Sequence, residues 1–134
     1  MRASAWRRTD AKLVFTATKN RVRVEIPILP QLQDVLDASP TGDLTFLITE
    51  FGKPFTAAGF GGWFRRRCDE AGLPHCSAHG LRKAGAATAA ENGATTSQLQ
   101  AIFGWATAKE PERYTRAALR TKMAHDGMPL LIRK

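Results

Sequence analysis

The residues best suited to chemistry lie in the C-terminal half of the chain. His79 and Arg82 are three residues apart, so on a helix both side chains project from one face. Arginine suits a phosphate because its planar guanidinium donates two parallel hydrogen bonds and stays charged. Tyr114 is the single tyrosine beside seven phenylalanines. Since phenylalanine would fill a core equally well and has no hydroxyl to satisfy, Tyr114 is a candidate functional residue.

The charge of the chain favours a negatively charged partner. Twenty Lys and Arg against 12 Asp and Glu give a net charge of +8, with a pI of about 10.2. Nucleic acid is the first candidate, an anionic membrane surface the second, and a basic protein with neither partner the third. No stretch approaches the ~18 apolar residues of a membrane span, and no signal-peptide pattern is present. The sequence therefore predicts a cytoplasmic protein with no membrane partner.

Several basic side chains are candidates for contacts with nucleic acid. Residues 65–67 form a run of three arginines on a predicted helix, which is either a solvated face or a set of phosphate contacts. The candidate DNA-binding residues are Arg21, Arg65, Arg66, Arg67, Lys83 and Arg113.

The N-terminal segment predicts a small antiparallel hairpin. Residues 13–16 are a strand candidate, and residues 21–26 alternate charged residues with Val or Ile, the period of a half-buried strand. The turn between them, residues 18–20, has Lys19 at its tip. Residues 7–10 are polar and are predicted to form another turn.

Caps and breakers predict three helices after the hairpin. Pro30 suits the first turn of one helix. Thr56 can cap a second helix, which Gly72 ends. Ser77 caps a third, central helix rich in alanine, and Gly93 follows its end.

Two further helices complete the prediction. A capping box beginning at Thr95 starts a short helix with Leu99, Ile102 and Phe103 toward the core, and Gly104 closes it. A proline three residues before the tyrosine can start the next helix, and residues 119–131 form a final helix or tail. The fold is therefore predicted as α+β and mainly α, a hairpin sheet followed by a helical bundle in a single domain.

The order of these motifs resembles the second half of the catalytic domain of tyrosine recombinases, the phage-type integrases. Each motif alone is weak, but the ordered set at family-like spacing is specific, and it covers roughly Trp6 to Ala118. The motifs are the lysine hairpin and the proline that ends it (Thr18–Ile28), His79-Gly-Leu-Arg82, Gly104-Trp105 and Glu112-Arg113-Tyr114.

The resemblance implies cleavage and rejoining of DNA strands without metal or cofactor. Tyr114 would be the nucleophile that forms a 3′-phosphotyrosine bond, and Arg82 would hold the non-bridging phosphate oxygens. His79 would accept the tyrosine proton or hydrogen-bond the phosphate, and Lys19 would be the general acid. Trp105 stands where many members have histidine. Its indole N–H can donate to a phosphate oxygen but cannot shuttle a proton.

The resemblance also sets expectations about partners and completeness. It implies double-stranded DNA as partner and self-association on DNA, as a tetramer in the family, partly through an exchanged C-terminal helix. The family pattern has a first catalytic arginine and a DNA-clamping domain upstream of the hairpin, and the sequence lacks both. We therefore expect a partial catalytic domain whose cleavage is impaired in this chain alone.

Three other functions compete with recombination. A non-catalytic DNA-binding remnant of an integrase would keep the basic surface alone. A type IB topoisomerase-like enzyme would share the tyrosine chemistry. A basic helical protein-interaction domain would need neither DNA nor the tyrosine.

Cysteine chemistry is not expected. Cys68 and Cys76 are too few for a disulfide framework, and their spacing, even with His75 and His79 nearby, fits no zinc pattern. Cys68 falls on an apolar helical face, so it is predicted to lie in the core. No metal site is predicted.

Overall fold

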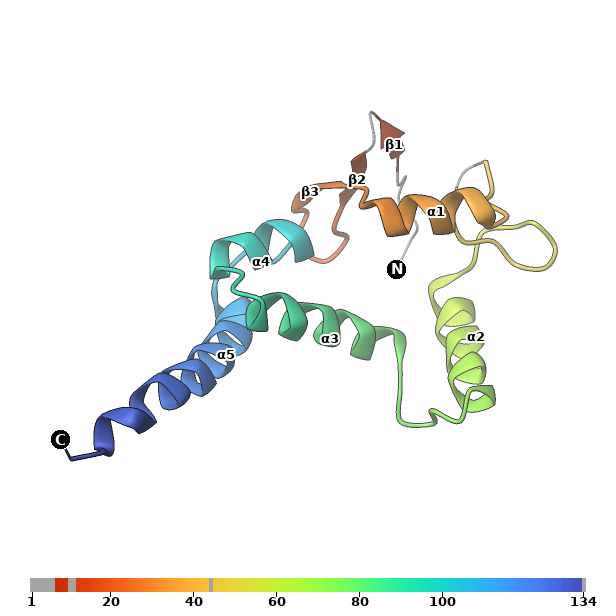
Figure 1. Cartoon of the computed structure of the whole chain (residues 1–134). Helices are drawn as coiled ribbons and strands as arrows, with labels where there is room; N and C mark the ends of the chain where they lie inside the picture. Colours follow the sequence, from red (N-terminus) through yellow and green to blue (C-terminus); the bar gives the residue numbers. More distant parts are fainter. Residues whose placement is uncertain (1–6, 10–11, 44, 134) are drawn as a thin grey trace. The chain divides into compact units, whose positions relative to one another are not determined.

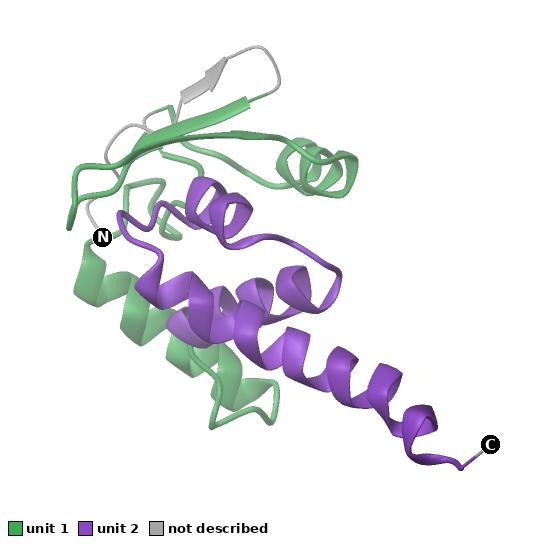
Figure 2. Cartoon of the chain, turned by 90° about the vertical axis from the view of Figure 1, so that its left-hand side faces the viewer, with its two compact units in different colours: residues 1–78 green, residues 79–134 purple. Residues whose placement is uncertain are grey.

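The computed structural model of the chain describes residues 7–9, 12–43 and 45–133, a small sheet followed by helices (Figure 1). The chain divides into two compact units, residues 1–78 and residues 79–134 (Figure 2). The predicted fold class, α+β and mainly α with an N-terminal antiparallel sheet, is confirmed. Among the described residues, no helix is both long enough and apolar enough to cross a membrane.

The first unit begins with a three-stranded antiparallel sheet of order β1-β2-β3. Its strands are β1 (Arg7–Thr9), β2 (Lys12–Thr16) and β3 (Arg23–Pro27). Leu13 pairs with Ile26 and Phe15 pairs with Val24, so these four side chains share one face. Leu13 and Val24 are buried, as the two-residue period predicts.

The turn between β2 and β3 carries Lys19 and Arg21. The Ala17 N–H donates to the Val22 carbonyl at 2.8 Å, and the Arg21 N–H donates to the Ala17 carbonyl at 2.8 Å. Arg21 has a φ of 60°, a left-handed conformation that is uncommon for a residue with a Cβ. Because β2 and β3 pair antiparallel on either side of this turn, the predicted hairpin is confirmed. Lys19 is exposed within the turn.

The prediction of a turn over residues 7–10 is wrong for Arg7–Thr9. These residues form β1, in which Arg8 pairs with Leu13 of β2. Charged residues are common in edge strands, where they discourage pairing with a further strand. Asp10 lies outside the described residues.

Two helices follow the sheet in the first unit. Helix α1 (Pro30–Ala38) starts at its proline, as predicted, since a first-turn N–H needs no partner within the helix. Helix α2 (Ala57–Glu70) is capped by Thr56, whose hydroxyl accepts from the Gly59 N–H at 3.0 Å. Gly72 follows its end with a φ of 72°, which confirms the predicted stop.

Four rings pack together on and just before α2. They are named the α2 aromatic cluster and comprise Phe55, Phe60, Trp63 and Phe64, with contacting ring centroids 5.4–6.5 Å apart. Cys68, further along the same helix, is buried, as predicted. The apolar side of α2 is therefore held largely by contacts between aromatic rings.

The second unit consists of helices α3 (Ala78–Glu91), α4 (Thr96–Phe103) and α5 (Lys109–Gly127), then a 3₁₀ turn, η1 (Met128–Leu131). Helix α3 begins directly after Ser77, and its alanines at 86 and 90 are buried. Gly93 follows its end with a φ of 95°, as predicted for a glycine that ends a helix.

The predicted capping box of α4 is confirmed. The Thr95 hydroxyl accepts from the Gln98 N–H at 3.1 Å, and the Gln98 side chain accepts from the Thr95 N–H at 2.8 Å. Leu99 is fully buried. Ile102, one turn later on the same face and predicted to face the core, is 42% exposed instead, so the cover over Leu99 does not extend to the last turn of α4 at this position.

Helix α5 is longer than predicted. It begins at Lys109, so Pro111 lies within its first turn and does not start it. A proline is tolerated there because the first N–H groups of a helix are unpaired. The helix then continues to Gly127, so most of residues 119–131 belong to it. Exposed apolar side chains follow at Met128, Leu130, Leu131 and Ile132.

Candidate active site

Arg82 is the charged centre of the candidate site. It lies in the second turn of α3 and is half-buried. One guanidinium nitrogen, Nη2, donates a hydrogen bond to the backbone carbonyl of Phe103 at the end of α4. The guanidinium carbon also lies 5.3 Å from the centroid of the Phe103 ring and 5.0 Å from that of the Trp105 ring. Both separations are within the range of cation–π attraction.

The turn after α4 brings two rings to the same arginine. Gly104 is buried and left-handed, with a φ of 69°, and it ends the helix between Phe103 and Trp105. The two ring centroids are 5.1 Å apart. Gln100 donates from its side-chain amide to the Trp105 carbonyl at 3.5 Å, which helps to hold this turn.

Tyr114 extends this pair of rings. Its ring stacks on that of Trp105, with centroids 5.8 Å apart and an interplanar angle of 21°. We name Phe103, Trp105 and Tyr114 the aromatic row. Helices α3, α4 and α5 therefore bring the guanidinium of Arg82 and the only tyrosine onto the same indole ring.

Burial is the main influence on Arg82. Desolvation lowers the pKa of Arg82, and attraction to Tyr114 partly opposes this shift. The guanidinium remains charged, since arginine is not deprotonated in proteins. The site thus holds a fixed positive charge next to a phenol, an arrangement that can bind an anion such as a phosphate diester.

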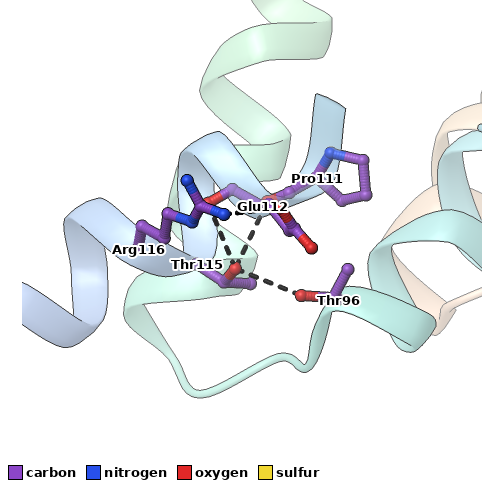
Figure 3. Close-up of polar contacts among 5 residues, drawn as sticks. All are labelled: Thr96, Pro111, Glu112, Thr115 and Arg116. Atoms are coloured by element: carbon purple, nitrogen blue, oxygen red, sulfur yellow. Dashed lines mark hydrogen bonds and ion pairs between the residues drawn. The ribbon is translucent and has the colours of Figure 1, made fainter. Parts of the chain in front are cut away.

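A threonine pair, Thr96 of α4 and Thr115 of α5, joins the two helices (Figure 3), and Thr115 directly follows Tyr114 in the sequence. The Thr115 and Thr96 hydroxyl oxygens are 3.2 Å apart. Thr115 also lies 3.3 Å from the carbonyl of Glu112 and 3.5 Å from that of Pro111, one turn earlier in α5. Because a hydroxyl has one proton, Thr115 donates to these carbonyls and accepts from Thr96. This bond fixes the rotation of α5, and hence the direction of the tyrosine.

The sequence matches the phage integrase family over residues 7–120. The chain belongs to this family. The match spans nearly all the described residues and confirms the resemblance found in the motifs. No curated protein matches the sequence significantly.

Solved integrase and recombinase structures share the fold of this family member. XerA recombinase superposes with a TM-score of 0.68 at 18% identity, covering 93% of this chain and 47% of XerA. The Tn1549 transposon integrase, solved with circular intermediate DNA, gives 0.58 at 18% identity and covers 86% of this chain and 48% of the integrase. The catalytic domain of bacteriophage HP1 integrase gives 0.59 at 23% identity, with 92% and 68% covered. The chain spans about half the length of the first two.

The structure of this integrase-family chain gathers three of the five predicted catalytic residues. Arg82, Trp105 and Tyr114 are in contact through the aromatic row. His79 is exposed on α3, one turn before Arg82, and its side chain makes no hydrogen bond or ion pair with another described residue. Lys19 belongs to the first unit, where it is exposed in the β2–β3 turn.

The predicted DNA-binding side chains are all exposed. In the first unit, Arg65 and Arg67 form ion pairs within α2 at 3.5 Å and 2.6 Å, with the carboxylates of Asp69 and Glu70. In the second unit, the Arg113 guanidinium lies 3.8 Å from the Glu110 carboxylate. The other three are Arg21, Arg66 and Lys83. Exposed ion pairs are weak, so these arginines remain available to a stronger anion.

Two features of the site escaped the sequence analysis. Phe103 was expected only to face the core, yet its carbonyl and its ring both contact Arg82. The Thr96–Thr115 bond was not expected, because both threonines fit an ordinary polar helix surface. The sequence pattern that could have indicated the contact is the aromatic-Gly-aromatic order of residues 103–105. The left-handed glycine between the two rings lets both of them contact Arg82.

The described residues contain no group of three or more His, Cys, Asp or Glu that could hold a metal ion. Both cysteines are free thiols, with Cys68 buried and Cys76 half-buried.

Proposed function

We propose that this member of the phage integrase family cleaves and rejoins DNA strands in site-specific recombination, with Tyr114 as the nucleophile. The observation that carries the proposal is the contact of Arg82 and Tyr114 with one indole ring, that of Trp105. A phosphate held by this guanidinium would lie beside the phenol that attacks it. Proximity of this kind lowers the barrier to reaction substantially.

The proposed step is a transesterification. The Tyr114 oxygen bonds to phosphorus while the bond to the 5′ oxygen breaks, giving a 3′-phosphotyrosine and a free 5′-hydroxyl. The phenol proton passes to His79, and the leaving oxygen receives a proton from Lys19. A 5′-hydroxyl from another strand then reverses the step without ATP, because the covalent bond conserves the phosphodiester energy.

Arg82 and Trp105 bind the phosphate in this proposal. Arg82 balances the charge on the non-bridging oxygens, which grows as the nucleophile approaches. Trp105 can donate its one indole N–H to a phosphate oxygen while its ring face stays against the arginine. Proton transfer therefore falls to the histidine and the lysine.

Double-stranded DNA is the proposed partner. Support comes from the net charge of +8, from the six exposed basic side chains, and from solved relatives bound to DNA, such as XerH recombinase on its palindromic difH substrate. If these side chains contact phosphates, DNA affinity falls steeply as salt rises. Affinity that is independent of salt would instead support a protein-interaction domain.

We further propose self-association on DNA, as a tetramer. Support comes from the exposed apolar side chains after α5, which a second copy could cover. Sedimentation of the DNA complex, with Leu131→Asp as the variant, would test this.

The match of one family across both compact units also favours a single catalytic domain for residues 1–134. A protein that recombines DNA would act in the cytoplasm.

Capture of the covalent intermediate tests the proposal. The full chain is incubated with sheared genomic DNA from its own host, denatured, and digested with nuclease and trypsin. We expect a nucleotide on the Tyr114 peptide, and sequencing of the trapped DNA would give the target site. Tyr114→Phe should give none.

The other functions give different results in the same assay. DNA binding without any adduct, unchanged in Tyr114→Phe, would identify a non-catalytic binding module and contradict strand cleavage. An adduct with relaxation of supercoiled plasmid, but no exchange between two sites, would identify a topoisomerase-like enzyme.

A further inference from the structure

We propose that Phe103 is a positioning residue: with Trp105 it forms a cradle of two rings that orients the Arg82 guanidinium before DNA binds. This inference deepens the proposed strand cleavage and rests on it for its kinetic consequence. The cradle itself is a property of the free chain, and it can be measured without DNA.

Two kinds of contact hold Arg82 in the cradle. The guanidinium carbon lies 5.3 Å from the Phe103 centroid and 5.0 Å from the Trp105 centroid, so the positive charge meets both rings. The Phe103 carbonyl accepts one N–H. A guanidinium has five N–H donors, so the rest remain available to a phosphate.

The backing of the Phe103 ring limits its movement. Gly85 of α3 lies behind it, so close that a Cβ added there would be 3.5 Å from the ring's Cζ. The ring therefore contacts α3 at Gly85 and carries the Arg82 guanidinium of the same helix over its face.

Orientation before binding matters because arginine is long and flexible. A free side chain loses rotamer freedom when it grips a phosphate, and this loss weakens both binding and catalysis. In the cradle, that freedom is already restricted in the free protein. Phe103 thus acts on the reaction through Arg82 and touches no reacting atom.

The first measurement is the NMR resonance of the Arg82 side-chain Hε in the full wild-type chain without DNA, assigned by its loss in Arg82→Lys. We expect ring currents to move it clearly from the position of a solvated arginine. A resonance at the solvated position would overturn the cradle, whatever any Phe103 variant does.

The second measurement replaces Phe103 with mono-, di- and trifluorophenylalanine by site-specific incorporation. Fluorine withdraws charge from the ring face at nearly constant shape, so the cation–π attraction weakens stepwise. We expect the rate of Tyr114 adduct formation at saturating DNA to fall by about threefold to tenfold in total, with affinity changing less than about twofold. The DNA is the target trapped from the host genome.

A matched control uses the same substitutions at Phe60, whose ring contacts Phe55 and Trp63 in the α2 aromatic cluster. The rate should not change there. A rate equally insensitive at Phe103 would overturn the kinetic role of the cradle and leave strand cleavage standing. If the wild-type chain forms no adduct, strand cleavage fails, and the Arg82 resonance still decides whether the cradle exists.

Discussion

The two compact units use aromatic side chains in different ways. In the first unit, the four rings of the α2 aromatic cluster contact one another. In the second unit, the rings of the aromatic row also contact one another, and a cation, the guanidinium of Arg82, lies over two of them, Phe103 and Trp105. Among the described side chains, no cation lies over a ring of the α2 cluster.

This difference distinguishes rings that stabilise the fold by packing from rings that hold a charged side chain of the candidate site. A ring that contacts only other rings contributes buried apolar area, so a residue of similar volume can replace it at modest cost. A ring under a guanidinium contributes the negative charge of its face, which an aliphatic side chain lacks. The comparison predicts that substitutions in the row change reactivity, whereas substitutions in the cluster change stability.

The largest effect should come from Tyr114→Phe. The substitution removes the proposed nucleophile and keeps the ring that stacks on Trp105, so adduct formation should be abolished. The free energy of unfolding should change by less than about 0.5 kcal/mol, because no described residue hydrogen-bonds the tyrosine hydroxyl. Mass spectrometry measures adduct formation, and urea unfolding measures the free energy of unfolding. An adduct on the Tyr114→Phe variant would show that Tyr114 is not the nucleophile.

Arg82→Lys should have the next largest effect. Lysine keeps the charge but loses the planar fork, so single-turnover cleavage should slow by about 10²- to 10³-fold. Arg120→Lys, an exposed arginine further along α5, is the control and should leave the rate unchanged. Equal rates in the two variants would mean that only charge, and not geometry, is required at position 82.

Phe60→Ala tests the other side of the comparison. Phe60 contacts Phe55, Trp63 and Phe64, with centroids 5.7–5.9 Å apart, so its loss should lower the free energy of unfolding by about 2 kcal/mol. This value is reduced from that of a fully buried ring because Phe60 is half-buried. The rate per folded molecule should not change.

The control for this prediction is Phe51→Ala. Phe51 is 79% exposed, so urea unfolding should detect almost no change. A slower cleavage rate in folded Phe60→Ala would show that the α2 cluster takes part in the reaction, and the distinction between the two groups of rings would fail.

The smallest effect should come from Thr115→Val. Loss of the hydroxyl leaves the Thr96 oxygen without its partner and should cost about 1 kcal/mol of unfolding free energy. Thr121→Val is the matched control, since the Thr121 hydroxyl donates only to the Ala117 carbonyl of its own helix. If both variants lose equal stability, the threonine pair does not anchor α5.

The sequence predicted the parts of the fold that local rules decide. The β2–β3 hairpin follows from alternation and a polar turn, and the first residue of α2 follows from Thr56. The capping box at Thr95 and the glycine at 93 also act within a few residues. For the helix caps, the deciding partner lies within about one helical turn of the residue.

Two features were missed, one because the sequence carries no local pattern for it and one because its partner is distant in the sequence. Strand β1 exists because β2 pairs with it, and the polar residues 7–9 carry no pattern of their own that indicates a strand. The contact between Arg82 and Phe103 joins residues 21 positions apart. For the site, spacing and family resemblance predicted Arg82, Trp105 and Tyr114, which the structure brings together, but not that the arginine lies against two adjacent rings.

The sequence order of the aromatic row and its arginine has a consequence for folding kinetics. All four residues fall within residues 82–114: three lie on helices α3, α4 and α5, and Trp105 lies in the short segment between α4 and α5. Closing such short loops costs little chain entropy, and contacts between near neighbours in sequence form quickly. We therefore expect these contacts to form on the timescale of helix docking, before any slower pairing of strands limits the rest of the chain.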